Sequence, residues 1–181
     1  MPTSPQRIVP EKGIDISPQK RQALTDSASK LKQKIDDLKT SIQSPEHLAL
    51  LPDIQIYYNA VQYALEQDIF FEESDIEIAE KFLKQGTERA EQLKQGLTPW
   101  TTATGLIVRG YLSDLDNSVQ PYGLTVPESF SPTTNQKHRL DIWHHGRGAK
   151  LSELKFIEGQ QTKFGEFTPD DTFMLHTYGR W

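Results

Sequence analysis

The chain of 181 residues contains no cysteine, which excludes disulfide bonds, thiolate metal sites and cysteine nucleophiles. It also has no excess of basic residues, because 20 Lys and Arg stand against 25 Asp and Glu and give a net charge of -5. Binding to phosphate backbones or to anionic lipid depends on positive charge, so the composition argues against a nucleic-acid or membrane partner. No apolar run approaches the roughly 18 residues that a membrane-spanning helix needs.

Complete catalytic motifs are missing as well. No serine stands in the G-x-S-x-G pattern of a nucleophile elbow, and neither H-E-x-x-H nor a glycine-rich nucleotide-binding loop occurs. His144 and His145 are neighbours on an expected strand and would point to opposite faces, so they cannot share one metal ion there. The sequence therefore predicts no metal site, no cofactor and no complete catalytic apparatus. Residues 1–7 lack the apolar core of a signal peptide, and the compartment stays undetermined.

Helical periodicity follows an irregular lead-in at 1–16. Ser17 and Pro18 are typical of a helix start, with a hydroxyl at the N-cap and a proline in the first turn. Apolar residues then recur at steps of three and four, which predicts one narrow seam: Leu24, Ala28, Leu31, Ile35, Leu38 and Ile42. This seam at 24–42 supports an alternative hypothesis, in which the chain is a non-enzymatic module that pairs with a partner helix.

Two further helices are expected before the pattern changes. The first runs from about 53 to 67 and has a broad apolar stripe. The second begins at a capping box formed by Ser74 and Glu77 and ends near Gly96. Residues 17–98 are therefore predicted to form a helical region. Aromatic residues on and after the first of these helices leave a third hypothesis open, a small-ligand or carbohydrate-binding domain: Tyr57, Tyr58, Tyr63, Phe70 and Phe71.

Beyond Pro99 the pattern is that of strands separated by turns. Strands are expected at 106–112, 120–126, 139–144 and 172–176, with a short helix at 151–158. Helices followed by this β-β-β-α-β order predict a mixed α/β fold.

The best candidate for chemistry is the glycine turn directly after the third expected strand, His144-His145-Gly146-Arg147-Gly148. Glycines at a strand end let the backbone turn sharply, so that its N–H groups can face an anion. In acyl transfer such donors stabilise the tetrahedral oxyanion by on the order of 3–4 kcal/mol each. The other interpretation is a plain strand-to-helix turn in which glycine is needed only for its dihedral angles. The candidate oxyanion-loop residues are His145, Gly146, Arg147 and Gly148.

Two segments around this turn resemble a known enzyme class. The run SVQPYGLTVPESF at 118–130 and the run RLDIWHHGRG at 139–148 together resemble the opening of the α/β-hydrolase core in prolyl-oligopeptidase-like and related serine esterases. The stretches LPDIQ at 51–55 and PWT at 99–101 resemble the N-terminal part of a secreted bacterial group within that class. The resemblance covers residues 13–181.

The resemblance implies an N-terminal helical region, followed at 99–181 by the first four strands of an incomplete α/β-hydrolase sheet. The first two strands would form an antiparallel pair, the third would carry the oxyanion loop, and the fourth would be its sheet neighbour. The backbone N–H of Arg147 or Gly148 would donate to the oxyanion, and His145 would shape the loop without acting as general base. Nucleophile, acid and histidine follow the fourth strand in this fold.

The expected function is therefore the N-terminal portion of a serine hydrolase, esterase or peptidase, truncated before the nucleophile elbow and inactive alone. An ester or peptide would be the substrate only of a full-length form, and the resembling proteins are exported. An incomplete sheet would leave its last strand as an unpaired edge with Phe173, Met174 and Leu175 uncovered. Self-association is hypothesised through that sheet edge or through the helix at 17–43.

Overall fold

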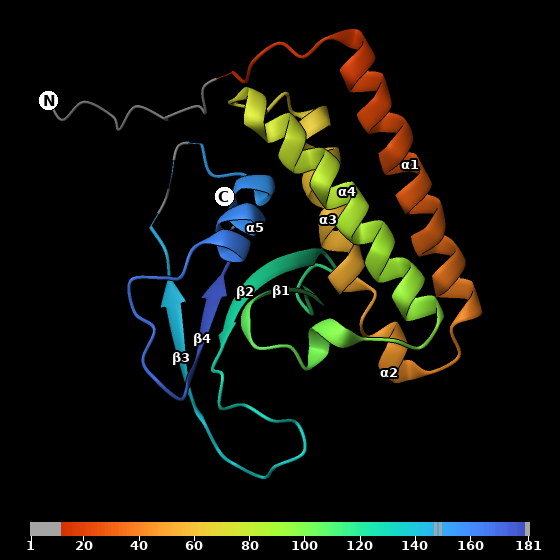
Figure 1. Cartoon of the computed structure of the whole chain (residues 1–181). Coiled ribbons are helices and arrows are strands. Elements are labelled where there is room, and N and C mark those ends of the chain that lie inside the picture. Colours follow the sequence, from red (N-terminus) through yellow and green to blue (C-terminus); the bar gives the residue numbers. More distant parts are fainter. Residues whose placement is uncertain (1–11, 147, 149, 180–181) are drawn as a thin grey trace, which may run out of the picture.

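The computed structural model describes residues 12–146, 148 and 150–179, and places a layer of helices beside a four-stranded mixed sheet (Figure 1). The coarse prediction of a mixed α/β fold is confirmed. The elements in chain order are α1 (Pro18–Ser41), α2 (Pro45–Leu48), α3 (Pro52–Glu66), α4 (Glu73–Lys94), the 3-10 helix η1 (Pro99–Thr101), β1 (Gly105–Leu112), β2 (Val119–Val126), β3 (Arg139–His144), α5 (Glu153–Thr162) and β4 (Thr172–Thr177).

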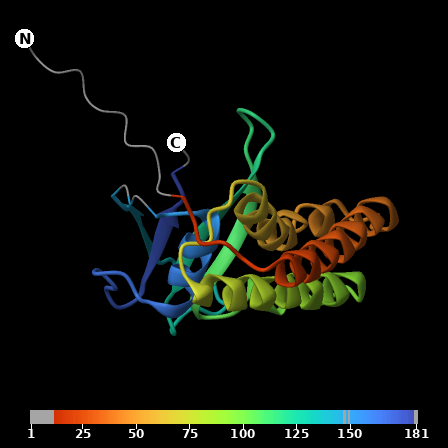
Figure 2. The same ribbon diagram turned by 90° about the horizontal axis from the view of Figure 1, so that it is seen from above.

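The first helix begins where the sequence predicts, because the Ser17 side chain accepts a hydrogen bond from the Lys20 N–H at 3.3 Å. Its apolar seam faces α3 and α4, which lie alongside it in the view from above (Figure 2). The seam residues Leu24, Ala28, Leu31, Ile35 and Leu38 are at most 3% exposed. Ile42 is only partly buried. The seam is therefore part of the core of this chain.

Helix α4 begins one residue earlier than predicted, and its capping differs from the predicted Ser74–Glu77 box. The carboxylate of Asp75 accepts hydrogen bonds from the N–H groups of Phe71 at 2.7 Å and Glu72 at 3.1 Å. The same carboxylate is buried and lies 2.5 Å from the Lys155 ammonium of α5, so it ties α5 to the start of α4.

The sheet order is β1-β2-β4-β3, with β1 and β2 antiparallel, β2 and β4 antiparallel, and β3 and β4 parallel. The prediction that the last strand forms an unpaired edge is wrong. β4 lies between two partners, Met174 is buried, and Phe173 and Leu175 are half-buried. The edges of the sheet are β1 and β3.

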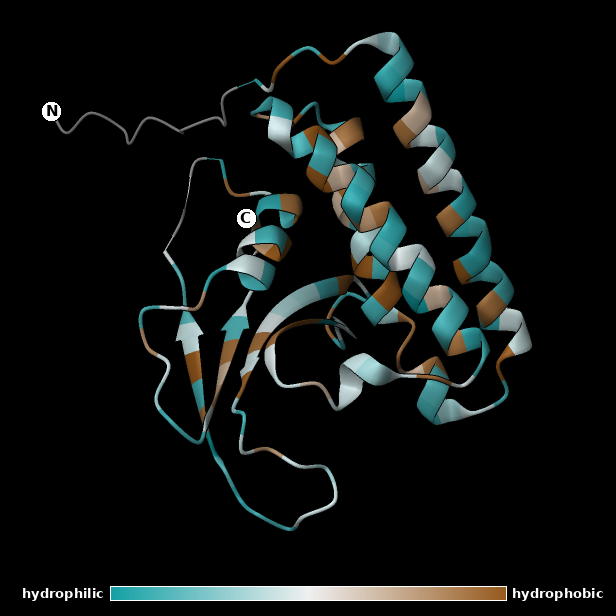
Figure 3. Cartoon of the chain, viewed as in Figure 1, coloured by the Kyte–Doolittle hydropathy of each residue, from teal (hydrophilic) through white to brown (hydrophobic). Residues whose placement is uncertain are grey.

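Helices α3 and α5 pack on the same face of the sheet. A Cβ on Gly110 would lie 2.2 Å from the Pro52 carbonyl oxygen of α3, and a Cβ on Gly123 would lie 2.2 Å from the Gln160 side chain of α5. Strand register places these glycines on one face, because Gly123 pairs with Val108, two residues from Gly110. The register also aligns one aliphatic residue of each strand in a row across the opposite face: Ile107, Leu124, Leu175 and Ile142. Figure 3 shows hydrophobic bands on β3 and β4.

Candidate functional site

The predicted oxyanion loop connects the end of β3 to Ser152, whose side chain caps α5 by accepting from the Lys155 N–H at 3.2 Å. Gly146 is exposed, and a Cβ there would meet no atom within 4 Å. A Cβ on Gly148 would meet only Leu151, at 3.4 Å. The backbone at Gly146 is thus open to an approaching group. Arg147, the other predicted donor, lies outside the described residues.

The side chain of His145 contacts both this loop and helix α5. Its Nδ1 lies 2.8 Å from the Gly146 carbonyl oxygen, and its ring stacks at a tilt on Phe156 of α5, with 5.6 Å between ring centroids. A carbonyl only accepts, so Nδ1 donates this hydrogen bond, and Nε2 is the second ring nitrogen. That Nε2 is buried and has no hydrogen-bond partner among the residues that the structure describes. This geometry agrees with a loop-shaping residue.

The neighbouring His144 has a different surrounding. Its Nδ1 lies 2.8 Å from the Thr177 hydroxyl of β4, and the side chain is exposed. The two adjacent histidines therefore contact different elements. Within the described part of the chain, no group of three or more His, Asp or Glu side chains is placed to hold a metal ion.

His176 of β4 is a third histidine in this region, and the sequence did not single it out. It is buried, and Gly165 approaches it so closely that a Cβ there would lie 2.9 Å from the ring. Burial lowers the pKa of His176, and the nearby His145 lowers it further. Burial therefore favours the uncharged form of His176, beside the loop that follows β3.

A second concentration of polar groups lies at the outer edge of β1, and the sequence did not reveal it. Asp53, in the first turn of α3, is 1% exposed. Its carboxylate accepts from the Trp100 indole at 2.9 Å, from Arg109 Nε at 2.8 Å and from the Gly110 N–H at 2.7 Å. An acidic residue in the first turn of a helix is the only sequence signal of this cluster. Its partners are 47 to 57 positions away along the chain.

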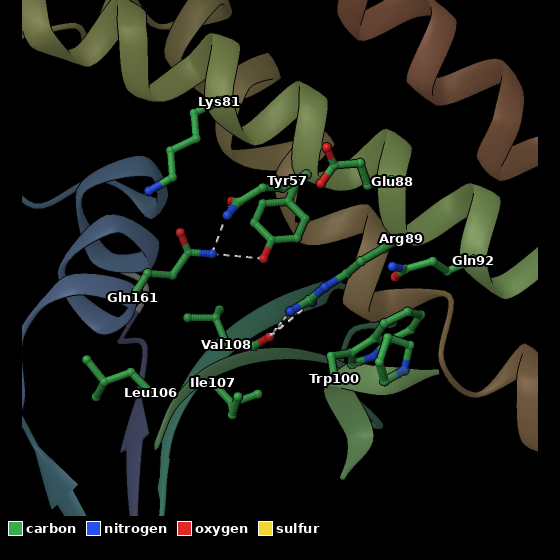
Figure 4. Close-up of a pocket in the computed structure, with 12 residues that line it drawn as sticks. Tyr57, Lys81, Glu88, Arg89, Gln92, Trp100, Leu106, Ile107, Val108 and Gln161 are labelled. Carbon is green, nitrogen blue, oxygen red and sulfur yellow. Dashed lines mark hydrogen bonds between the residues drawn. The ribbon is translucent and has the colours of Figure 1, made fainter. Parts of the chain in front are cut away.

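Arg89 of α4 also contacts that edge and lines a pocket of about 370 Å³ (Figure 4). Its guanidinium donates to the carbonyl oxygens of Val108 at 3.0 Å and Asp53 at 2.9 Å. It also lies 5.0 Å from the ring centroid of Tyr57 and 5.2 Å from that of Trp100. The polar side chains that line this pocket include Lys81, Glu88 and Gln161.

In the described segments, no helix has both the length and the apolar character required to cross a bilayer. Comparisons of the chain with protein-family models, with curated proteins and with solved structures found no match.

Proposed function

We propose that residues 1–181 form the N-terminal portion of a serine hydrolase of the α/β-hydrolase type, of the esterase or peptidase lineage. The observation that carries the proposal is the path of the chain from β3 to α5. β3 runs parallel to β4, ends at His144 and continues through the glycine turn into a helix. Open α/β sheets bind ligands beyond the carboxyl ends of their strands, and hydrolases take one oxyanion donor from the loop after the third strand.

The order of the strands supports the same proposal. The resemblance implies an antiparallel first pair, and β1 pairs antiparallel with β2 over its whole length. It also implies that the fourth strand is the sheet neighbour of the third, and β4 pairs with β3 over all six residues of each strand. Neither relation follows from the order of the elements along the chain.

The surfaces at β3 support a larger sheet. Strands in parallel pairs are normally covered on both faces, because crossover helices lie on each side. Here both helices that pack against the sheet, α3 and α5, lie on one face, while Leu140 and Ile142 of β3 are 56% and 55% exposed on the other. Among the described residues β3 has one strand partner only. Further strands and helices of a complete hydrolase would cover these surfaces.

In the proposed enzyme, a serine hydroxyl gives its proton to the catalytic histidine as its oxygen attacks the carbonyl carbon of an ester or amide, and the carbonyl oxygen becomes an oxyanion. The backbone N–H of Gly148, or of position 147, donates to that oxyanion, while His145 holds the preceding carbonyl of Gly146. The leaving group departs with a proton from the catalytic histidine, and water then hydrolyses the acyl-enzyme. Nucleophile, acid and base are supplied by residues outside 1–181, and the reaction uses no cofactor.

The alternative function, a module that pairs through the 24–42 seam, has less support. The seam residues from Leu24 to Leu38 are at most 3% exposed because α3 and α4 cover them. A partner helix could contact these residues only if α1 moved away from α3 and α4.

The proposal is tested by reading the coding DNA beyond codon 181 and expressing the complete open reading frame. We expect a G-x-S-x-G motif followed by an acidic residue and a histidine, and covalent labelling of that serine by a serine-directed phosphonate probe. In that protein Gly148→Pro removes one proposed oxyanion donor and should slow labelling by about 100-fold or more. The matched control Gly159→Ala, on the open side of α5, should label at the wild-type rate. A reading frame without this motif, or a complete protein that the probe does not label, would overturn the proposal.

A further inference from the structure

The pocket in front of Arg89 lies apart from the glycine turn, at the other end of α5. The turn precedes Ser152 at the start of that helix, whereas Gln161 stands in its last turn and lines the pocket. The remaining walls are α3, α4, η1 and β1 (Figure 4). A volume of about 370 Å³ falls within the range of small-molecule sites. This site does not depend on the proposed hydrolase function.

The pocket has more positive than negative charge to offer a ligand. Arg89 donates three hydrogen bonds to the carbonyl oxygens of Asp53 and Val108, so two of its five N–H groups are not used in these bonds. It has no carboxylate partner among the residues that the structure describes. Lys81 also has none there, and Figure 4 shows its ammonium group directed toward Gln161. Glu88, the one acid among the described residues that line the pocket, has a carboxylate oxygen 3.9 Å from the Lys84 ammonium. The two cations therefore favour an anion.

Gln161, which lines the same pocket, has an unused acceptor. The Gln161 amide nitrogen donates to the Tyr57 hydroxyl at 2.9 Å and to the Gln85 side chain at 3.2 Å. These two bonds fix which way the amide faces, so its carbonyl oxygen is directed away from them. That oxygen is buried and has no donor within the described part of the chain. A buried acceptor of this kind is satisfied when a bound molecule brings an N–H group.

From these contacts we infer that the pocket binds a small carboxylate that also carries an amide N–H, such as an N-acylated amino acid. The carboxylate would lie between the cationic groups of Lys81 and Arg89. The amide N–H would donate to the Gln161 carbonyl oxygen. The buried Tyr57 ring and the apolar side chains of β1 would contact the remainder of the ligand.

The inference is tested by titrating the ¹⁵N-labelled chain with N-acetylglycine and following the side-chain N–H signals of Gln161 and Trp100 by NMR. We expect saturable shifts in the millimolar range. N-acetylglycinamide lacks the charge and acetate lacks the amide, so each should bind at least about threefold more weakly. Absence of shifts up to about 50 mM, or equal shifts with the acid and its amide, would overturn the inference.

Two variants locate the site. Lys81→Gln removes the charge and Gln161→Leu removes the acceptor, and each should raise the dissociation constant by about three- to tenfold. Lys94→Gln is the matched control, because Lys94 is an exposed lysine on the same helix that does not line the pocket. Backbone amide spectra establish that each variant is folded. Binding that Lys81→Gln and Lys94→Gln weaken equally would show a nonspecific effect of net charge and would overturn the assignment.

Discussion

The two edge strands of the sheet differ in what bonds to their outer backbone groups. At the outer edge of β1, the Val108 carbonyl accepts from Arg89 and the Gly110 N–H donates to the Asp53 carboxylate, so side chains replace a neighbouring strand. At the outer edge of β3, no described side chain plays this part, and an ion pair between Arg139 and Asp141 lies at the surface. Unpaired edges can pair with other chains. The sheet therefore ends at β1 and remains open at β3.

Both edges use an arginine whose Nε donates to an aspartate, yet the two pairs differ in environment. The Asp53 side chain is 1% exposed and accepts from three separate groups. In the pair at β3, the Arg139 side chain is 74% exposed and the Asp141 side chain 27%. A buried carboxylate with several donors costs much to disrupt, whereas water replaces most of an exposed pair. The comparison teaches that burial, and not the residue types, decides what an ion pair contributes.

The most severe test of this difference is the substitution Asp53→Asn. We expect it to lower the free energy of unfolding by about 3–5 kcal/mol, because Arg109 loses its buried counter-ion. In addition, the asparagine NH₂ group, itself a donor, would face N–H groups that now donate to the carboxylate. Urea unfolding followed by circular dichroism measures the change. The matched substitution Asp141→Asn at the other edge should cost less than about 1 kcal/mol. Equal losses in the two variants would contradict the distinction between the edges.

The next largest effect is expected from Gly110→Ala on β1. An added Cβ would lie 2.2 Å from the Pro52 carbonyl oxygen and 2.8 Å from the Ile56 side chain, so α3 would have to move away from the strand. Overpacking of this kind should lower the free energy of unfolding by about 1–3 kcal/mol. Gly159→Ala serves as control, since no atom lies within 4 Å of its Cβ and alanine favours a helix. An unchanged urea midpoint for Gly110→Ala would mean that α3 does not hold this edge closely.

Local patterns in the sequence predict the elements well, because they depend on neighbouring residues. The hydroxyl of Ser17 and the spacing of the α1 seam are enough to define a helix. Gly86 weakens the prediction of α4 when only helix propensity is considered. In the structure a Cβ on Gly86 would lie 2.6 Å from Leu31 and 3.2 Å from the Cβ of Tyr57, so glycine lets three helices meet. That reason is tertiary and has no local signal.

Contacts between distant positions account for what the sequence does not predict. The edge closure by Asp53, Arg89 and Arg109 joins α3, α4 and β1, and no spacing rule connects residues so far apart. The position of β4 between β2 and β3 is equally nonlocal, so the sequence pattern predicts the exposed edge on the wrong strand. For the candidate site, the sequence singled out His145 and the glycine turn but not the buried His176 behind them.

A smaller effect is the dependence of the free energy of unfolding on pH. It concerns β4, which contains His176, whereas β1 contains no histidine. Burial lowers the pKa of His176 in the folded protein below its ordinary value of 6.5. Between these two values the unfolded chain binds the proton more readily, so the free energy of unfolding falls as the pH drops below 6.5. One proton gives a slope of at most about 1.4 kcal/mol per pH unit. Urea midpoints between about pH 5.5 and 7.5 measure this slope.

His176→Gln should flatten the pH dependence of the free energy of unfolding, and the control His47→Gln on α2 should leave that dependence unchanged. A dependence that survives His176→Gln would assign it to another group.

The smallest change in stability, and the most direct test of the open edge, is expected from Ile142→Lys on β3. Ile142 is 55% exposed, so the substitution should alter the free energy of unfolding by no more than about 0.5 kcal/mol. It should nevertheless reduce self-association, since a lysine on an edge strand opposes pairing with another chain. Light scattering after size-exclusion chromatography, over a wide range of protein concentration, measures the mass.

Leu112→Lys on β1 is the control, because Leu112 is similarly exposed at 53% but lies on the closed edge. A wild-type mass that stays monomeric at every concentration would show that the open edge does not pair. A loss of stability well above 1 kcal/mol in Ile142→Lys would show that something in the chain covers β3, and the contrast between the two edges would then fail.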